Sequence, residues 1–213
     1  MIPLLLALVS AAPSLGKAIK CDADTDCFYM PKEAATGALA PCLLILSCTG
    51  AYPVDLDTCR IVADSLGWVL ATCHATRNHR AGDLNDRDIV RTLGKLRRLR
   101  VDTTRVFVFG FSGQAVQALA TMFEHPELVC GVVATCAHAG ALPLADWPLL
   151  QGHFAYLVSR QRDWNRMDNE RMYQLFNENG LVSELAMTPG EHGPGSRREL
   201  LAGCRWLAAR TAR

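Results

Sequence analysis

Residues 105–115, with the sequence RVFVFGFSGQA, decide the fold that we expect for this chain. Residues 106–109 form a short run of β-branched and aromatic side chains, which is typical of a buried strand in a parallel sheet. The run ends in Gly110-Phe111-Ser112-Gly113, and residues 114–124 have a helical composition. A sharp turn between such a strand and helix lifts the serine hydroxyl clear of the sheet, and the glycines tolerate the crowded backbone. Ser112 is therefore the candidate nucleophile.

The turn departs from the full Gly-x-Ser-x-Gly pattern, because Gln114 stands where the last glycine would be. That glycine lets the helix pack closely on the strand, so we expect Gln114 to point outward or to force a small shift. The alternative interpretation is an ordinary strand-to-helix turn in which Ser112 caps the helix N-terminus.

Size and composition indicate a single globular domain. The chain has 213 residues, of which 50% are hydrophobic and 20% charged, enough to bury one substantial core. A formal net charge of +1 gives no electrostatic basis for binding nucleic acid or a membrane surface. The basic run at residues 95–100 ends a helical pattern, and we interpret it as a solvent-exposed helix face. The oligomeric state is left open.

The N-terminal segment resembles the apolar part of a secretory signal. Its apolar run, from Ile2 to Val9, is too short to cross a bilayer. No Lys or Arg precedes this run, and Pro13 spoils one cleavage site, so a first strand or a mis-set start codon is the alternative. We expect a signal peptide at residues 1–16, one folded domain at 17–213, and a secreted or periplasmic location rather than a cytoplasmic one.

The cysteines leave the compartment open. Nine cysteines are an odd number, so at least one thiol is free or pairs outside the chain. Cys21 and Cys27 flank a polar stretch and are the expected pair in an oxidising compartment. The sequence has no Cys-x-x-Cys and no His-Glu-x-x-His motif, so local spacing predicts no zinc site.

Apolar, strand-like runs alternate with helical segments along the chain, which predicts an α/β protein with a mostly parallel sheet, built as a three-layer α/β/α sandwich. A hairpin over 18–30 is expected to add an antiparallel edge. The expected strands are 41–47, 68–73, 106–109, 131–136, 154–159 and 182–188, and the expected helices are 56–66, 83–99, 114–124, 169–178 and 197–209.

Catalytic side chains in open parallel sheets gather at the carboxyl ends of the strands. His192 follows the last expected strand in a Gly-rich loop, 189–194, that lets its imidazole swing over the sheet, so it is the candidate base. His74 and His138 also end strands and are candidates to line a pocket. His79 competes less well, and His153 begins a strand and is expected to be structural.

The expected acid is Asp163, in the loop after the penultimate strand, because it completes the order Ser…Asp…His. Asp168 and Asp146 are the alternatives, although Asp168 also suits the N-cap of the helix at 169–178.

Two backbone N–H groups are needed to bind an oxyanion. We expect one from Gly113 and the other from Gly50 or Ala51, in the turn after the 41–47 strand. Trp147 and Trp164 are candidates to line the substrate pocket, and Trp164 and His138 are the predicted substrate-binding residues.

These features together resemble the α/β-hydrolase superfamily over nearly the whole chain after about residue 18. The resemblance is closest to compact esterases without a large lid: the phospholipase/carboxylesterase, dienelactone-hydrolase and polyhydroxybutyrate-depolymerase-like groups. It rests on three stretches: Asp102 with Arg105 to Ser112, His125-Pro126-Glu127, and the histidine loop Pro189 to Gly193. The chain departs from these groups at Cys48-Thr49-Gly50, where they carry His-Gly, and at Gln114.

The resemblance implies a cofactor-free serine hydrolase with Ser112 as nucleophile, His192 as base and Asp163 as acid. Its substrate would be a small-molecule or polymer ester, cleaved through an acyl-enzyme. A site without a lid favours small or polymer-end esters over long lipid chains. The alternatives are a catalytically decayed binding protein with the same fold, favoured by the two departures, and a peptidase that uses the same three residues.

Overall fold

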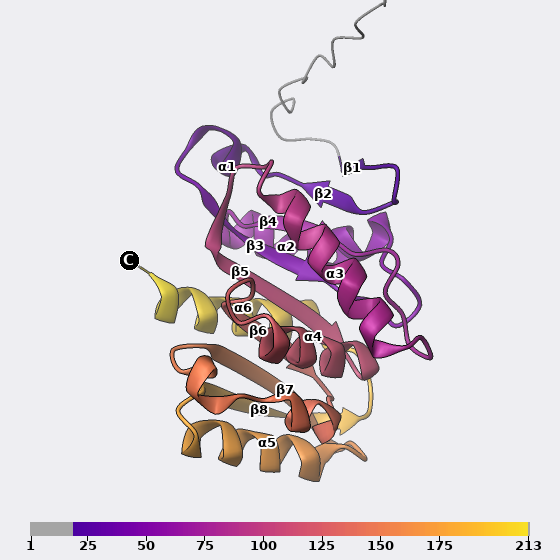
Figure 1. Cartoon of the computed structure of the whole chain (residues 1–213), viewed down its shortest axis with the longest axis vertical. Helices are drawn as coiled ribbons and strands as arrows, with labels where there is room; N and C mark the ends of the chain where they lie inside the picture. The colour runs from indigo at the N-terminus through magenta and orange to yellow at the C-terminus, as the bar shows by residue number, and fades with distance from the viewer. Residues whose placement is uncertain (1–18, 213) are drawn as a thin grey trace, which may run out of the picture.

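The computed structural model describes residues 19–212. The signal peptide expected at residues 1–16 lies outside this range. Within it, one mixed sheet holds eight strands in the order β1-β2-β4-β3-β5-β6-β7-β8. Figure 1 shows this order from the N-terminal hairpin at the top to β8 and α5 at the bottom. All pairs from β4 to β8 are parallel, and β1 and β2 form the predicted antiparallel edge.

The strands range from two to eleven residues, and β3, β4 and β6 are almost entirely buried. Their bounds are β1 Lys20–Cys21, β2 Cys27–Tyr29, β3 Ala40–Ile45, β4 Val69–Thr72, β5 Val101–Phe111, β6 Gly131–Thr135, β7 Phe154–Arg162 and β8 Val182–Glu191. The helices are α1 Lys32–Thr36, α2 Pro53–Leu66, α3 Gly82–Leu96, α4 Gly113–Glu124, α5 Arg166–Glu178 and α6 Arg197–Thr211, with two 3₁₀ turns, Ala139–Leu144 and Trp147–Leu150.

Helices cover both faces of the sheet, which makes the predicted three-layer sandwich. One apolar cluster joins the sheet to α3, α4 and α5, and a second joins its other face to α2 and α6. The side chains of β5 alternate between the two clusters: Val106 and Val108 lie in the first and Phe107 in the second. All three are at most 3% exposed, so β5 is the central strand that both layers hold in place.

The predicted elements are all present, and the differences lie at their ends. The 106–109 strand begins earlier, at Val101, because Val101 pairs with Ala40 ahead of a register shift in β3. The helix expected at 83–99 ends at Leu96, where turns take over. The short helix α1 was not predicted. Among the described residues, no helix has the length and apolar character that crossing a bilayer requires.

The N-terminal hairpin is fastened by a disulfide and an ion cluster. Cys21 and Cys27 form the predicted disulfide. Between them, Asp22, Asp24 and Asp26 surround Lys95 Nζ of α3, at 2.6, 2.8 and 2.8 Å. Partial burial lowers the pKa of Lys95, but these three hydrogen bonds raise it overall. The Asp26 side chain is fully buried and also accepts from Thr92 and from the backbone of His74.

We expect Lys95→Met to lower the free energy of unfolding by about 1–3 kcal/mol, because it leaves the buried Asp26 carboxylate without its cation. Chemical denaturation measures the loss, with Lys20→Met on the exposed β1 as the matched control. Equal stability of the two variants would contradict a stabilising role for the cluster.

Candidate active site

The turn after β5 holds Ser112 in a strained backbone conformation, with φ 54° and ψ −124°. Such a conformation costs a non-glycine residue on the order of 1–3 kcal/mol, so its surroundings must enforce it. The Ser112 N–H donates to Thr135 O of β6 at 2.9 Å, and the Ser112 carbonyl accepts from Ala115 and Val116 in the first turn of α4. These bonds fix the side chain at the carboxyl end of the central strand.

The two glycines of this turn, Gly110 and Gly113, leave room for close neighbours. A Cβ on Gly110 would lie 2.2 Å from the carbonyl oxygen of Gln114, which is backbone and cannot move aside. A Cβ on Gly113 would lie 2.6 Å from Asn78 Oδ1. The glycines therefore let the α4 backbone and the Asn78 side chain close around the turn.

Ser112, His192 and Asp163 lie in hydrogen-bonding contact. His192 Nε2 is 3.0 Å from Ser112 Oγ, and His192 Nδ1 is 2.8 Å from Asp163 Oδ1. An ionised carboxylate only accepts, so Nδ1 carries the ring proton and Nε2 is left to accept from the serine hydroxyl. The three residues follow β5, β7 and β8, whose carboxyl ends share one edge of the sheet (right side of Figure 1).

The Asp163 carboxylate is held ionised although its side chain is buried. Burial raises the pKa of this group, but hydrogen bonds from Cys136, the Asn165 backbone N–H and His192 outweigh it and lower the pKa below its ordinary value. The carboxylate can thus orient the imidazole and balance a positive charge on it.

Aromatic rings flank the imidazole. Trp164 stacks on His192 with ring centroids 3.8 Å apart and planes at 17°, and Phe111 lies 5.0 Å away in a tilted arrangement. Trp164 is nevertheless 75% exposed, because its outer face opens to solvent. It confines the imidazole on one side and offers a flat apolar surface on the other.

A cluster of polar side chains joins the turn after β3 to the turn that holds Ser112. Of the two expectations for Gln114, the outward orientation is wrong: its side chain is 1% exposed, and its Nε2 donates to Asn78 Oδ1 at 3.3 Å. The Asn78 N–H in turn donates to the Cys48 carbonyl, and Cys48 Sγ donates to the Phe111 carbonyl at 3.3 Å. The glutamine that replaces a glycine is therefore part of the packing between the two turns, at the cost of a buried Oε1 with no partner among the described residues.

Gly50 and Ala51 take part in the backbone of that turn. The Gly50 N–H donates to Ser47 O at 3.2 Å, and the Ala51 carbonyl accepts from His74 Nδ1 at 3.2 Å. His74 thus supports this turn, and it does not line the cleft around Ser112.

Other candidates occupy structural positions. Asp168 is not the N-cap of α5, because the helix begins earlier, at Arg166; its Oδ2 accepts from the Ala139 N–H. Asp146 precedes the second 3₁₀ turn. Trp147 does not line the site: its ring packs against Phe123 and Phe176 of the core.

A cleft of about 350 Å³ opens around Ser112. Its wall is mainly polar and contains no acidic side chain among the described residues. Trp164 and His138, the two residues predicted to bind substrate, both line it, together with Arg77, Asn78, His79 and Gln117. His138 Nδ1 accepts from the Gly140 N–H, so a neutral ring has its proton on Nε2.

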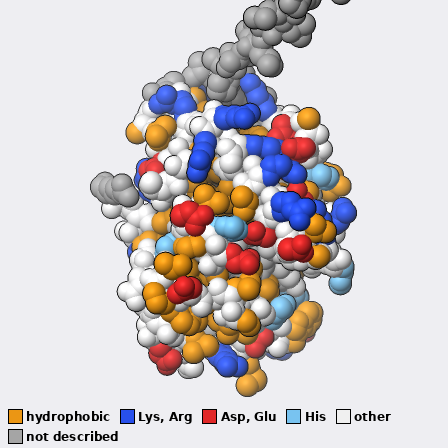
Figure 2. Space-filling model, in the orientation of Figure 1, with side chains coloured by type: hydrophobic (Ala, Val, Ile, Leu, Met, Phe, Trp, Pro, Cys, Tyr) orange, Lys and Arg blue, Asp and Glu red, His pale blue; other side chains and the backbone are white. Residues whose placement is uncertain are grey.

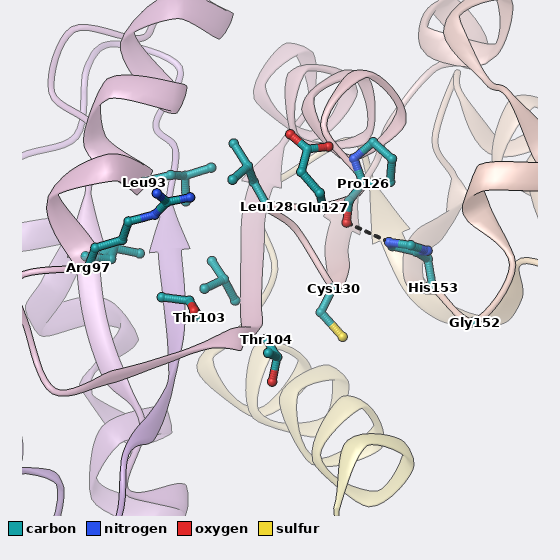
Figure 3. A pocket seen from close by; sticks show the side chains of 12 residues that line it. Leu93, Arg97, Thr103, Thr104, Pro126, Glu127, Leu128, Cys130, Gly152 and His153 are labelled. Atoms are coloured by element: carbon teal, nitrogen blue, oxygen red, sulfur yellow. Dashed lines mark hydrogen bonds between the residues drawn. The ribbon is translucent and has the colours of Figure 1, made fainter.

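A second cavity, of about 370 Å³, lies at the opposite, amino-terminal edge of the sheet. Figure 3 shows its wall, where His153 donates to the Pro126 carbonyl at 2.8 Å. His153 therefore has the structural role expected of it. Ser112, Asp163 and His192 do not line this cavity.

Comparisons with known proteins identify the fold. No protein-family model matches the sequence, and no curated protein is detectably similar to it in sequence. Solved structures do match. A ferulic acid esterase matches with TM-score 0.69 and 13% identity, over 87% of this chain and 92% of that one. An esterase from Pyrobaculum calidifontis matches with TM-score 0.68 and 16% identity, over 88% of this chain and 80% of that one. A Bacillus cereus carboxylesterase matches with TM-score 0.66 and 13% identity, over 87% of this chain and 94% of that one. The chain has the α/β-hydrolase fold.

Sequence reasoning missed the pair that holds the histidine loop. Arg160, near the end of β7, donates to Glu199 of α6 and to Thr188, and its second nitrogen lies 3.4 Å from the Pro194 carbonyl. Burial raises the pKa of Glu199, but bonds from the Ser196 backbone and from Arg160 outweigh it and hold the pKa at about 2. An arginine in a strand and a glutamate in a helix give no local signal of this contact.

We expect Glu199→Gln to lower the free energy of unfolding by about 1–3 kcal/mol at neutral pH. Because the folded-state pKa of about 2 lies below the ordinary 4.5, the stabilisation is complete above that ordinary value and is lost as the pH falls toward 2. Denaturation of both proteins across this range should show their difference shrinking in acid. Glu178→Gln, at the exposed end of α5, is the matched control; a pH-independent difference would contradict the assignment.

Proposed function

We propose that this protein is a serine hydrolase that cleaves carboxylic esters through an acyl-enzyme. The observation that carries the proposal is the continuous line of contacts from Ser112 Oγ through His192 to Asp163, at 3.0 and 2.8 Å. The fold it shares with solved esterases supports ester hydrolysis as the reaction class.

In the proposed reaction, His192 Nε2 accepts the Ser112 proton as Oγ attacks the ester carbonyl. The Asp163 carboxylate holds the imidazole in the required tautomer and balances its charge. The same proton then passes to the leaving alcohol, and a water molecule activated by His192 releases the acid and restores Ser112.

The oxyanion would be bound by the backbone N–H of Gly113, at the positive N-terminus of α4. The second donor is proposed from the turn after β3. Since the Gly50 N–H already donates to Ser47 O, Ala51 is the less committed of the two expected amides.

The substrate is proposed to be an ester with a small acyl group, free or at the end of a polymer. The wall of the cleft is mainly polar, and the Trp164 ring provides its main apolar surface. A long acyl chain would therefore remain in water and gain little of the roughly 0.8 kcal/mol that each buried methylene contributes. Trp164 and His138 would contact the acyl or alcohol group.

A fluorophosphonate probe tests the nucleophile. We expect the wild-type protein to be labelled and Ser112→Ala to lose both labelling and esterase turnover, by about a thousandfold or more. Ser65→Ala, on the exposed side of α2, is the matched control. Labelling of Ser112→Ala as strong as that of wild type would refute the assignment.

A series of p-nitrophenyl esters tests the cleft. We expect kcat/KM for acetate and butyrate to exceed that for decanoate by about tenfold or more, because the cleft buries no long apolar chain. The rate measured with Ser112→Ala is subtracted from each wild-type rate, so that only turnover that depends on Ser112 is compared. A preference for decanoate would contradict an open, polar cleft.

The absence of any turnover that depends on Ser112 would instead favour a binding protein that retains the fold. The buried Gln114 and the Cys48-Thr49-Gly50 turn are the features that favour this second candidate. A peptidase with the same three residues is tested by p-nitroanilide substrates alongside the esters.

A further inference from the structure

Cys136 lies against the Asp163–His192 pair. It directly follows β6, where a positive φ of 54° turns its buried side chain toward the site. Its Sγ, a carboxylate oxygen of Asp163 and a ring nitrogen of His192 all lie within 4.8 Å of one another. A thiol, a carboxylate and an imidazole therefore meet at one point, although they are far apart in the chain.

One oxygen of this carboxylate has only a weak donor beside it. Asp163 Oδ1 accepts from His192 Nδ1 and from the Asn165 N–H at 2.9 Å, whereas the buried Oδ2 accepts from no N–H or O–H group among the described residues. The Cys136 thiol, a weak donor, hydrogen-bonds to the Asp163 carboxylate and lies 3.6 Å from the Gly193 carbonyl. A thiol and a buried carboxylate joined only by such a weak bond can exchange the thiol proton for a cation held between them.

The donor set selects the cation. Thiolate sulfur, imidazole nitrogen and carboxylate oxygen together suit Zn²⁺, and three protein ligands leave the fourth tetrahedral position to water. Zinc bonds of about 2.0–2.3 Å at tetrahedral angles separate neighbouring ligand atoms by roughly 3.3–3.6 Å. The ligand atoms of the cluster lie within 4.8 Å of one another, so zinc binding requires side-chain shifts that include a widening of the 2.8 Å contact between Asp163 Oδ1 and His192 Nδ1.

We propose that Cys136, Asp163 and His192 form an inhibitory Zn²⁺ site. The inhibition rests on the proposed function, since it acts on the proposed base. Zinc binds the Cys136 sulfur as its thiol proton leaves to solvent, and binds His192 Nδ1 as the ring proton moves to Nε2. An imidazole with Nδ1 bound to zinc and Nε2 protonated has no lone pair to accept the Ser112 proton, so Zn²⁺ stops hydrolysis without contacting the serine.

Metal binding is measured first, without reference to activity. Co²⁺ added to the wild-type protein should give the near-ultraviolet absorption of a cobalt–thiolate bond, and Zn²⁺ should displace it. Cys136→Ala should abolish this absorption. Cys136→Ser, which keeps the size of the side chain, should abolish it as well, so a folding defect of one variant does not decide the result. Cys48→Ala, which removes a different thiol near the cleft, should retain the absorption.

Inhibition is measured second, on a p-nitrophenyl ester. Zn²⁺ should inhibit wild type reversibly, with recovery on addition of a chelator, and Cys136→Ala should need about tenfold more Zn²⁺ or more for half-inhibition, relative to its own rate without metal. If the protein shows cobalt–thiolate absorption but no esterase activity, the zinc site stands and the proposed hydrolase function is refuted. Active protein with no such absorption, or equal inhibition of wild type and Cys136→Ala, would overturn the zinc site.

Discussion

The site depends on one local constraint, the strained backbone of Ser112. A non-glycine residue adopts φ 54° and ψ −124° only where its neighbours supply the free energy. Here β6 accepts the Ser112 N–H, and α4 donates two N–H groups to the Ser112 carbonyl. The two apolar layers that clamp β5 supply the rigidity behind these bonds. The hydroxyl projects from the sheet because a buried strand and a packed helix leave the turn no relaxed alternative.

The remaining parts of the site are placed by loops that leave neighbouring strands at the same edge. Each loop is fixed by its own buried polar contacts: Arg160 with Glu199 for the loop of His192, and Asn165 with the Cys136 carbonyl for the loop of Asp163. The Arg160 and Glu199 charges balance each other locally, and the face seen in Figure 2 carries both acidic and basic side chains. One ion pair and one neutral hydrogen bond thus fix the two loops without a strongly charged surface, which agrees with the near-neutral net charge.

Elements that the sequence predicted well share one physical basis. Strands buried on both faces read as continuous apolar runs, and the helices that cover them show one apolar stripe, so burial alone imprints the pattern. The errors fall where that pattern ends. Val101 joins β5 through a register shift in β3, Asp168 lies inside α5 rather than at its cap, and Gln114 is buried by a polar partner, Asn78, from a different loop.

The sequence by itself determined the α/β architecture, the strained serine turn and the order of the three candidate side chains, because these follow from local periodicity, glycine placement and the rule that parallel strands end at one edge. Only the tertiary structure decided the contacts between distant residues: the 2.8 and 3.0 Å line through His192, the stacking of Trp164 on it, and Cys136 beside Asp163. No local motif marks them, since the loops that carry them are positioned by packing between elements and not by the residues next to them in the chain.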